Sequence, residues 1–346
     1  MTDTRLLVVD LAATSRNWAL PPEGYEAIRA AAPGGWVVRF VREPTVSDGD
    51  GGAAPSADAL DAVREAEAYF GFGMSPTLFA AARRLRWIQS AAAGVTALLF
   101  PALRDGPVLV TNSAGVHAEP IAEHVLGGLL YLVRSFDVAV TLQRERRWDK
   151  EPFVGPAARV RELGECRALV VGTGGIGRAV GRRLAAMGVE CAGLRRRPEL
   201  GAPEGFARVA GLDALEGELP RADIVVISAP VTPATDRLLT AARLDLLPAG
   251  AIVVNVARGS LLDEGALAER VQSGRLRGAI LDVFAREPLS GTSPLWGLPE
   301  VLITPHVAAV SPRRFWEREL ALFFENWRRY ERGEPFLNTV DKVAGY

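Results

Sequence analysis

The sequence predicts an α/β protein of two domains, with a doubly wound parallel sheet in the second domain. The length of 346 residues exceeds what one hydrophobic core usually serves. The composition, 49% hydrophobic and 23% charged, is that of an ordinary soluble globular protein. Between residues 167 and 306, continuous apolar runs alternate with segments that suit helices. This alternation indicates parallel strands that are covered by helices on both faces.

The first part of the chain, residues 1–112, alternates short apolar runs with alanine-rich helical stretches. We expect its strands at Leu6–Val9, Trp36–Val41, Glu67–Phe70, Trp87–Gln89 and Val108–Thr111. From Ser47 to Asp58 the chain is rich in Gly, Ala and Asp. This composition is typical of a solvated connection, so we expect a mobile loop there without a role of its own.

A long helix is predicted from about Glu119 to Phe136, because apolar residues recur along one of its faces at helical spacing. A long polar connection that contains Trp148 follows this helix.

A second aromatic helix is predicted near the end of the sequence. Aromatic residues recur at helical spacing from Phe315 to Trp327, and Gly333 is typical of a helix end. We interpret the aromatic stripe as a packing face, and a tail that packs on the first domain makes that domain discontinuous. The predicted division is residues 1–112 plus 311–346 for the first domain and 113–310 for the second.

The second domain carries a glycine-rich motif between its first strand and first helix. We expect the strands of this domain at Ala168–Val171, Val189–Leu194, Ile224–Ser228, Ile252–Val256, Ala279–Val283 and Val301–Thr304. The motif is Gly172-x-Gly174-x-x-Gly177, and the helix after it has one apolar face and ends at Gly188. In such a motif the glycines allow a tight turn, backbone approach to a pyrophosphate and close helix packing.

The motif therefore predicts a Rossmann-like site for a dinucleotide, whose phosphates the helix amides would bind. The alternative is a glycine turn without a ligand, because a chain with 35 glycines gives chance matches easily. The residues that we expect to form the phosphate turn are Gly172, Gly174, Gly175, Ile176 and Gly177.

Three polar residues follow later strand ends, where doubly wound sheets bind their ligands: Arg258, Glu287 and His306. An arginine can hold a carboxylate by a bidentate pair and polarise a keto oxygen. A histidine can give that oxygen a proton near neutral pH, and a neighbouring carboxylate orients the imidazole and favours its protonated form. Each residue alone also suits a surface or loop role. Together, behind a dinucleotide motif, they predict the reduction of a 2-keto acid.

The composition argues against several other functions. The formal net charge of −1 favours neither nucleic acid nor a membrane surface as a partner. No apolar run is long enough to span a membrane, the N-terminus lacks a signal-peptide pattern, and two cysteines make no disulfide framework. We therefore expect a cytoplasmic protein. No metal-binding motif is present, and the histidines other than His306, which are His117 and His124, are expected to be structural.

Several segments resemble the D-isomer-specific 2-hydroxyacid dehydrogenase family, and most of all its glyoxylate/hydroxypyruvate reductase-like branch. The resemblance covers nearly the whole chain. Its segments are LRWIQSAAAGV from Leu85, NSAGVHAEPIAEHVLGGLL from Asn112, VGTGGIGR, APVTPATDRLL from Ala229, NVARGSLLDEGAL, DVFAREPL, SPLWGLPEVLITPHVA and the tail from Glu325.

The resemblance implies two Rossmann-like domains, of which the smaller, flavodoxin-like one binds the substrate. It implies that Arg258 binds the substrate carboxylate and carbonyl, that His306 is the general acid or base, and that Glu287 orients His306. The substrate would contact Ala93, Gly94, Arg258 and His306, and the dinucleotide would be lined by Ala229, Pro230, Ala257 and Asp282. It also implies a homodimer formed through the helix from Glu119 and the arm after it.

The residues after the second strand of the second domain indicate NADP(H) as the preferred cofactor, with NAD possible. An NAD site places a carboxylate there to accept the ribose 2′-hydroxyl. Here Arg195 holds that position, and Arg196 and Arg197 follow it. Guanidinium groups bind a 2′-phosphate, which a carboxylate would repel. The alternative is a solvated basic turn, and Arg195 and Arg196 are the two side chains that we expect to contact the phosphate.

Two other functions remain open on this fold. A formate dehydrogenase-like enzyme of the same superfamily pairs its histidine with Gln, and Glu287 argues against it. A dinucleotide-sensing corepressor can keep the Arg, Glu and His set, so these three residues do not exclude it. Turnover of 2-keto acids distinguishes the enzyme from the sensor.

Overall fold

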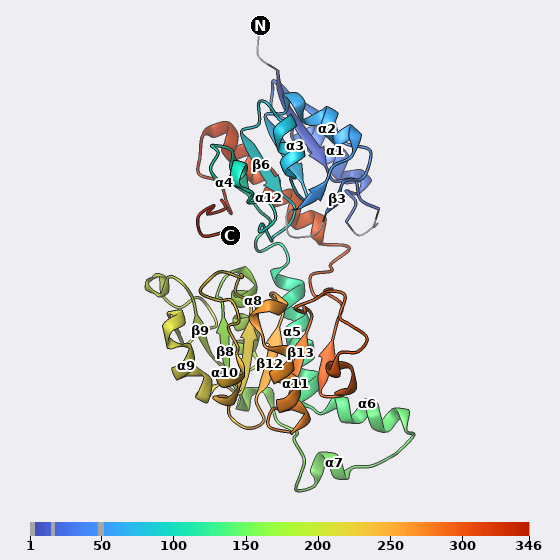
Figure 1. Cartoon of the computed structure of the whole chain (residues 1–346), viewed down its shortest axis with the longest axis vertical. Coiled ribbons are helices and arrows are strands. Elements are labelled where there is room, and N and C mark those ends of the chain that lie inside the picture. The colour runs from blue at the N-terminus through green and yellow to red at the C-terminus, as the bar shows by residue number, and fades with distance from the viewer. Residues whose placement is uncertain (1–3, 15–17, 48–51, 346) are drawn as a thin grey trace. The chain divides into compact units, whose positions relative to one another are not determined.

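The chain forms two α/β units that differ in strand order and in the helices that cover each sheet (Figure 1). This computed structural model describes residues 4–14, 18–47 and 52–345. One unit comprises Met1–His117 and Val310–Tyr346, and the other comprises Ala118–Ala309. We refer to them below as the discontinuous unit and the continuous unit.

The boundary that the sequence placed after residue 112 falls after His117 in the structure. Side-chain hydrogen bonds tie the intervening segment to the discontinuous unit. Ser113 Oγ donates to Ser90 O at 2.8 Å, and Asn338 Nδ2 donates to Ala114 O at 2.8 Å.

The discontinuous unit is built on a five-stranded parallel sheet in the order β2-β1-β5-β6-β7. Counted along the sheet strands alone, this is the flavodoxin-like order 2-1-3-4-5. The elements are β1 (Arg5–Asp10), α1 (Pro22–Ala31), β2 (Trp36–Phe40), β3 (Val46–Ser47), β4 (Ala53–Ala54), α2 (Ala57–Ala62), β5 (Ala68–Gly71), α3 (Pro76–Ala81), β6 (Trp87–Ser90), α4 (Pro101–Arg104), β7 (Leu109–Thr111) and α12 (Phe315–Arg332).

Alternate strand residues of this sheet face two helical layers. Leu7, Phe70 and Trp87 pack with α1 and α12 on one face, whereas Val8 and Ile88 pack with α2, α3 and α4 on the other. The aromatic stripe of α12 is a packing face, as predicted. Its Phe323 stacks on Phe70 at 4.2 Å and on Trp87 at 5.7 Å between ring centroids.

The loop expected from Ser47 to Asp58 is only partly described, because residues 48–51 lie outside the described residues. On either side of them, β3 and β4 pair as a short antiparallel hairpin. Ser56 then begins α2, where its hydroxyl accepts a hydrogen bond from Ala59 N at 3.1 Å.

The continuous unit holds a seven-stranded parallel sheet in the order β10-β9-β8-β11-β12-β13-β14. In strand order this reads 3-2-1-4-5-6 with a seventh strand added, which is the doubly wound dinucleotide-binding arrangement. The elements are α5 (Ala118–Val133), α6 (Phe136–Arg144), α7 (Glu151–Val154), β8 (Arg167–Val171), α8 (Gly175–Ala186), β9 (Glu190–Leu194), β10 (Arg208–Ala210), α9 (Leu215–Glu218), β11 (Ile224–Ile227), α10 (Ala241–Asp245), β12 (Ile252–Asn255), α11 (Glu264–Gln272), β13 (Gly278–Leu281) and β14 (Val301–Ile303).

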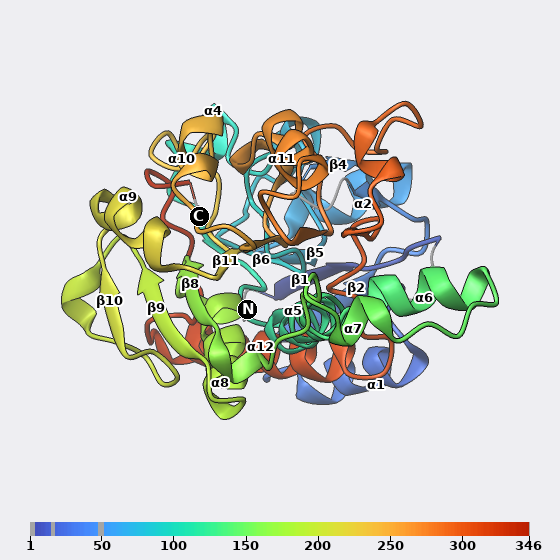
Figure 2. The same cartoon turned by 90° about the horizontal axis from the view of Figure 1, so that it is seen from below.

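Helices cover both faces of this sheet, as the apolar runs predicted. Figure 2 shows α5 and α8 on one side of the sheet and α10 and α11 on the other. The strands divide their side chains accordingly: Val170 and Val226 pack in the core beneath α5 and α8, and Leu169 and Val225 pack in the core with α9, α10 and α11.

The long helix predicted from Glu119 to Phe136 is wrong in its end point. It stops at Val133, Ser135 adopts a left-handed conformation with φ 55°, and α6 starts in a direction bent by 69°. A buried ion pair fixes this bend, because Arg277 donates to both carboxylate oxygens of Asp137 at 2.7 and 2.9 Å and to Leu132 O at 2.8 Å. The helix α6 and the short α7 then extend from the rest of the continuous unit as an arm (Figure 1).

Among the described residues, no single helix is long and apolar enough to cross a membrane. The helices α5 and α6 meet that test only when they are taken together across their 69° bend.

Candidate active site

The turn between β8 and α8 has the geometry of a phosphate-binding loop. Gly172 has φ 95°, and a Cβ atom on it would lie 2.7 Å from the backbone nitrogen of Ala229. A Cβ on Gly177 would collide with the carbonyl oxygen of Gly172. Both positions therefore require glycine, one for its backbone conformation and one for close packing of helix against strand.

The start of α8 leaves room and donors for an anion. A Cβ on Gly174 would meet nothing within 4 Å, so the backbone is open to close approach there. Arg178 N bonds to Gly174 O at 2.9 Å, and the amides that precede it in α8 have no acceptor within the helix. These residues fit the pyrophosphate of a dinucleotide, whose charge the helix N-terminus favours.

Arg195 is the first residue after β9, which is the position that the sequence predicted for it. Its amide donates to Ala210 O at 3.0 Å, and its Nη1 donates to Gly201 O at 3.2 Å. Arg196 and Arg197 are exposed. The end of this strand therefore carries guanidinium groups and no carboxylate.

Arg258 follows β12 in a turn that Asn255 organises from a buried position. Asn255 Nδ2 donates to Arg258 O at 2.9 Å, and its Oδ1 accepts from Ala257 N at 3.1 Å. A Cβ on the next residue, Gly259, would collide with the backbone of Phe284. Glycine thus lets the Arg258 turn lie directly against the segment that leads to Glu287.

Glu287 and His306 form a direct pair. Glu287 Oε2 lies 2.8 Å from His306 Nδ1, and Glu287 Oε1 accepts a hydrogen bond from Phe284 N at 2.9 Å. The carboxylate is therefore held on both oxygens. The His306 side chain is 48% exposed, and Nε2 is the ring nitrogen left to exchange a proton with a ligand.

Asp282 supports the turn that carries His306. Its buried carboxylate accepts from Thr304 Oγ1 at 2.6 Å, Val307 N at 2.9 Å and Ala308 N at 3.0 Å. Thr304 Oγ1 also lies 3.2 Å from Nε2 of His124 on α5. The expected contact of Asp282 with a dinucleotide stays a prediction, and so does the structural role expected of His124, which the contact with Thr304 supports.

In the discontinuous unit, the loop Ala91–Val95 follows the carboxyl end of β6. Ala92 N donates to Ser90 Oγ at 3.2 Å, and Asn112 Nδ2 holds Ala93 O at 2.8 Å. Neither Ala93 N nor Gly94 N donates a hydrogen bond to another described residue. These two amides are therefore available to a ligand such as a carboxylate.

Comparison with known proteins identifies the family. The family model described as "D-isomer specific 2-hydroxyacid dehydrogenase, NAD binding domain" matches residues 126–308, which include the phosphate turn, Arg258, Glu287 and His306. The chain belongs to the D-isomer-specific 2-hydroxyacid dehydrogenase family.

Curated members of this family are similar over most of the chain. Glyoxylate/hydroxypyruvate reductase A of Salmonella newport is 31% identical over 280 residues, which cover 78% of this chain and 85% of that protein. The D-3-phosphoglycerate dehydrogenase of Mycobacterium tuberculosis is 35% identical over 257 residues, but these cover only 46% of that longer protein.

Solved structures of related enzymes align with this chain over nearly its whole length. A D-isomer-specific 2-hydroxyacid dehydrogenase from Xanthobacter autotrophicus Py2, in complex with NADPH and MES, is 34% identical with a TM-score of 0.78 and covers 99% of both chains. The NADPH-dependent glyoxylate/hydroxypyruvate reductase of Sinorhizobium meliloti, in complex with NADP and sulfate, is 29% identical with a TM-score of 0.77 over 99% of this chain.

The cysteines of this 2-hydroxyacid dehydrogenase lie outside the candidate site. Among the described residues, no three His, Cys, Asp or Glu side chains gather to hold a metal ion. Cys166 and Cys191 are buried as free thiols, and burial raises the pKa of both, that of Cys191 to about 11. Neither thiol is therefore a thiolate at neutral pH.

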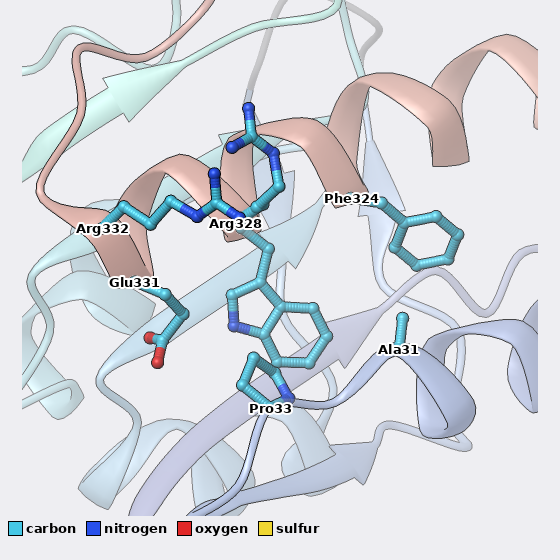
Figure 3. Close-up of a pocket in the computed structure, with 7 residues that line it drawn as sticks. Ala31, Pro33, Phe324, Arg328, Glu331 and Arg332 are labelled. Atoms are coloured by element: carbon cyan, nitrogen blue, oxygen red, sulfur yellow. The ribbon is translucent and has the colours of Figure 1, made fainter.

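A hollow in the discontinuous unit contains none of the predicted site residues (Figure 3). It lies between the end of α1 and the last turns of α12, and its Arg328 is paired with Glu325 at 2.7 Å. The lining residues are Ala31, Pro33, Phe324, Trp327, Arg328, Glu331 and Arg332.

Proposed function

We propose that this enzyme uses NADPH to reduce a small 2-keto acid to the corresponding D-2-hydroxy acid. The observation that carries the proposal is the Glu287–His306 pair, at 2.8 Å, in the same unit as a phosphate turn that requires glycine at two positions. An imidazole held by a carboxylate and open on its other nitrogen suits proton transfer to a keto oxygen. The bound dinucleotide supplies the hydride in such a reaction.

Each side chain has a separate role in this proposal. His306 gives its proton to the keto oxygen during reduction and takes it back during oxidation. Glu287 holds the imidazole so that Nε2 faces the substrate, and stabilises the positive charge of the protonated ring. Arg258 binds the substrate carboxylate and polarises the carbonyl.

The substrate carboxylate also contacts backbone amides in this proposal. Ala93 N and Gly94 N, which bond to no other described residue, donate to it from the loop after β6. Backbone amide donors stabilise a carboxylate through charge-assisted hydrogen bonds.

We propose NADPH as the preferred cofactor and NADH as a poorer one. The support is the arginine at the end of β9, where an NAD-specific site has a carboxylate. The related enzymes from Xanthobacter and Sinorhizobium, solved with NADPH and NADP, favour the same choice. The contacting residues would be the phosphate turn Gly172–Gly177, Arg195, Arg196, Ala229, Pro230, Ala257 and Asp282.

The substrates that we propose are glyoxylate and hydroxypyruvate, two small members of the class. The support is the similarity to glyoxylate/hydroxypyruvate reductases from Salmonella and Sinorhizobium. The test is to follow nicotinamide absorbance with glyoxylate, hydroxypyruvate and larger 2-keto acids, and to determine the configuration of each chiral product. Turnover confined to large acids would contradict the substrate, and an L product would contradict the stereochemistry.

A second candidate function is a dinucleotide-sensing corepressor on the same fold, because such proteins can keep the Arg, Glu and His set. Tight dinucleotide binding without turnover of any 2-keto acid would favour this sensor. We further propose a cytoplasmic homodimer that engages neither nucleic acid nor membrane, and the exposed arm of α6 and α7 is the support for the dimer.

A further inference from the structure

One carboxyl group of the discontinuous unit is completely buried and plays no part in the site described above. Glu319 lies on α12 with no exposed surface, and neither of its oxygens accepts a hydrogen bond from a described residue. The polar groups beside it are the Ser113 hydroxyl and the Gln89 amide, and burial raises the pKa of Glu319 to about 8. The side chain is therefore a neutral carboxylic acid at pH 7, with one O–H to donate.

The two polar neighbours of Glu319 both support the substrate loop Ala91–Val95. Ser113 Oγ donates to Ser90 O at 2.8 Å, and Gln89 Nε2 donates to the same oxygen at 3.3 Å. Ser90 Oγ in turn accepts from Ala92 N, while Ala92 O accepts from Ser113 N at 3.2 Å. Gln89, Ser90 and Ser113 are all completely buried, so no water replaces a bond that is lost here.

The Gln89 amide has a fixed orientation. Its Oε1 accepts from Thr111 Oγ1 at 2.6 Å and from Asn326 Nδ2 at 3.1 Å. Since Oε1 of Gln89 has two donors already, Ser113 Oγ is the acceptor that these two polar neighbours leave for the carboxylic acid, and the hydrogen of Ser113 itself points to Ser90 O.

We infer that Glu319 is a positioning residue for the substrate loop: its acid O–H donates to Ser113 Oγ and so keeps the Ser113 hydrogen on Ser90 O. A carboxylate can only accept. An ionised Glu319 therefore draws the Ser113 hydrogen to itself and removes one of the bonds that hold the loop. The amides of Ala93 and Gly94 then lose their alignment. The inference rests on the proposed role of this loop in binding that carboxylate.

The protonation state of Glu319 is not set by a charged partner. The strands β6 and β7 contain no ionisable residue, and among the described residues no ion pair includes Glu319. His117, at the end of the segment that bears Ser113, stacks on Phe315 with 5.3 Å between ring centroids. The other ionisable side chains of the adjoining helices are Glu317, Arg318, Glu325, Arg328, Arg329, Tyr330, Glu331 and Arg332 on α12 and Glu23, Tyr25, Glu26 and Arg29 on α1.

The test compares KM and kcat for glyoxylate from pH 6.5 to 9.5, at saturating NADPH, in the parent and in Glu319→Gln. We expect the parent KM to rise at least ~5-fold between pH 7 and pH 9.5, because the acid ionises across this range. Glu319→Gln keeps a donor at every pH, so its KM lacks this rise. The Ki of oxalate, which carries carboxylates but does not react, should show the same contrast.

Two further variants complete the test. Glu317→Gln removes an exposed carboxylate from the same helix and should keep the parent KM profile. Ser113→Ala should raise KM at pH 7 and abolish the alkaline rise, and it decides the question if Glu319→Gln does not fold. Superposable KM profiles for the parent and Glu319→Gln, or a parent-like profile in Ser113→Ala, would overturn the inference. A parent without turnover on any 2-keto acid would overturn the proposed function, and the inference with it.

Discussion

Glu287 Oε2 lies 2.8 Å from His306 Nδ1, while the other oxygen of the same carboxylate accepts the Phe284 amide at 2.9 Å. The imidazole is thus oriented by a carboxylate that cannot turn away without losing a backbone hydrogen bond. Both side chains are partly exposed, at 36% and 48%, so this pair contributes to orientation more than to stability.

His306→Gln should lower kcat by at least ~10²-fold, because the reaction loses its general acid. Dinucleotide binding, measured by fluorescence titration, should not change. Glu287→Gln is the companion variant, and it should fall between the parent and His306→Gln because the ring stays but its orientation weakens. Near-normal turnover in His306→Gln would remove this histidine from the mechanism.

Arg258→Ala should raise KM and lower kcat together, since one guanidinium both clamps the carboxylate and polarises the carbonyl. Arg258→Lys should recover only part of the loss, because an ammonium group cannot form the bidentate pair. Steady-state kinetics with glyoxylate checks both variants. If kcat alone fell, the carboxylate would be bound elsewhere.

The double variant Arg195→Asp/Arg196→Ala should shift the preference from NADPH towards NADH. The introduced carboxylate can accept the ribose 2′-hydroxyl and repels a 2′-phosphate. The measurement is the ratio of kcat/KM for the two cofactors. Arg197→Ala is the matched control and should leave the ratio unchanged. An unmoved ratio in the double variant would show that these arginines do not read the 2′-phosphate.

The arm should form a dimer interface. Its apolar side chains are unusually exposed, with Phe136 at 50%, Trp148 at 94% and Val154 at 75%. We expect a dimer in sedimentation at micromolar concentration, and a shift towards monomer in Phe136→Asp. Asp137→Ala should act in the same direction, because it removes the buried partner of Arg277 at the base of the arm. A monomeric parent would contradict the dimer.

The free energy of unfolding should depend on pH through the ionisation of Glu319. Unfolded Glu319 ionises near its ordinary pKa of 4.5, whereas folded Glu319 ionises near 8. The unfolded state therefore loses its proton first, and the free energy of unfolding falls as pH rises between these two values. Urea unfolding at pH 5 and pH 8 should show a larger loss in the parent than in Glu319→Gln. An equal loss in both proteins would mean that Glu319 is already ionised in the fold.

Most of the fold followed from the sequence, because buried parallel strands and their intervening helices have strong periodicity. The elements that were missed are short or break a pattern. The strand β10 has three residues, and the hairpin strands β3 and β4 have two each. The apolar stripe of α5 gives no sign of the break at Ser135, since the bend depends on a partner, Arg277, that is distant in sequence.

The residues of the candidate site also fall into those that the sequence predicted and those that it did not. Arg195, Arg258, Glu287 and His306 were recognisable because each follows a strand end, and the structure does bring Glu287 to His306. Supporting residues such as Asn255 and Thr304 could not be recognised from the sequence, because their roles depend on hydrogen bonds that form only in the folded chain. Glu319 is the clearest case: in the charged run from Glu317 to Glu319 nothing distinguishes a buried acid from a solvated one.

The position of α12 at the end of the chain also determines which of the two units can fold first during synthesis. Phe323 of α12 stacks against Phe70 and Trp87, so the discontinuous unit exposes one aromatic face of its sheet until α12 has left the ribosome. The continuous unit has all of its strands by residue 303 and can complete its core first. A nascent chain arrested after β14 should therefore hold a folded dinucleotide-binding unit preceded by an unfinished, chaperone-binding N-terminal sheet.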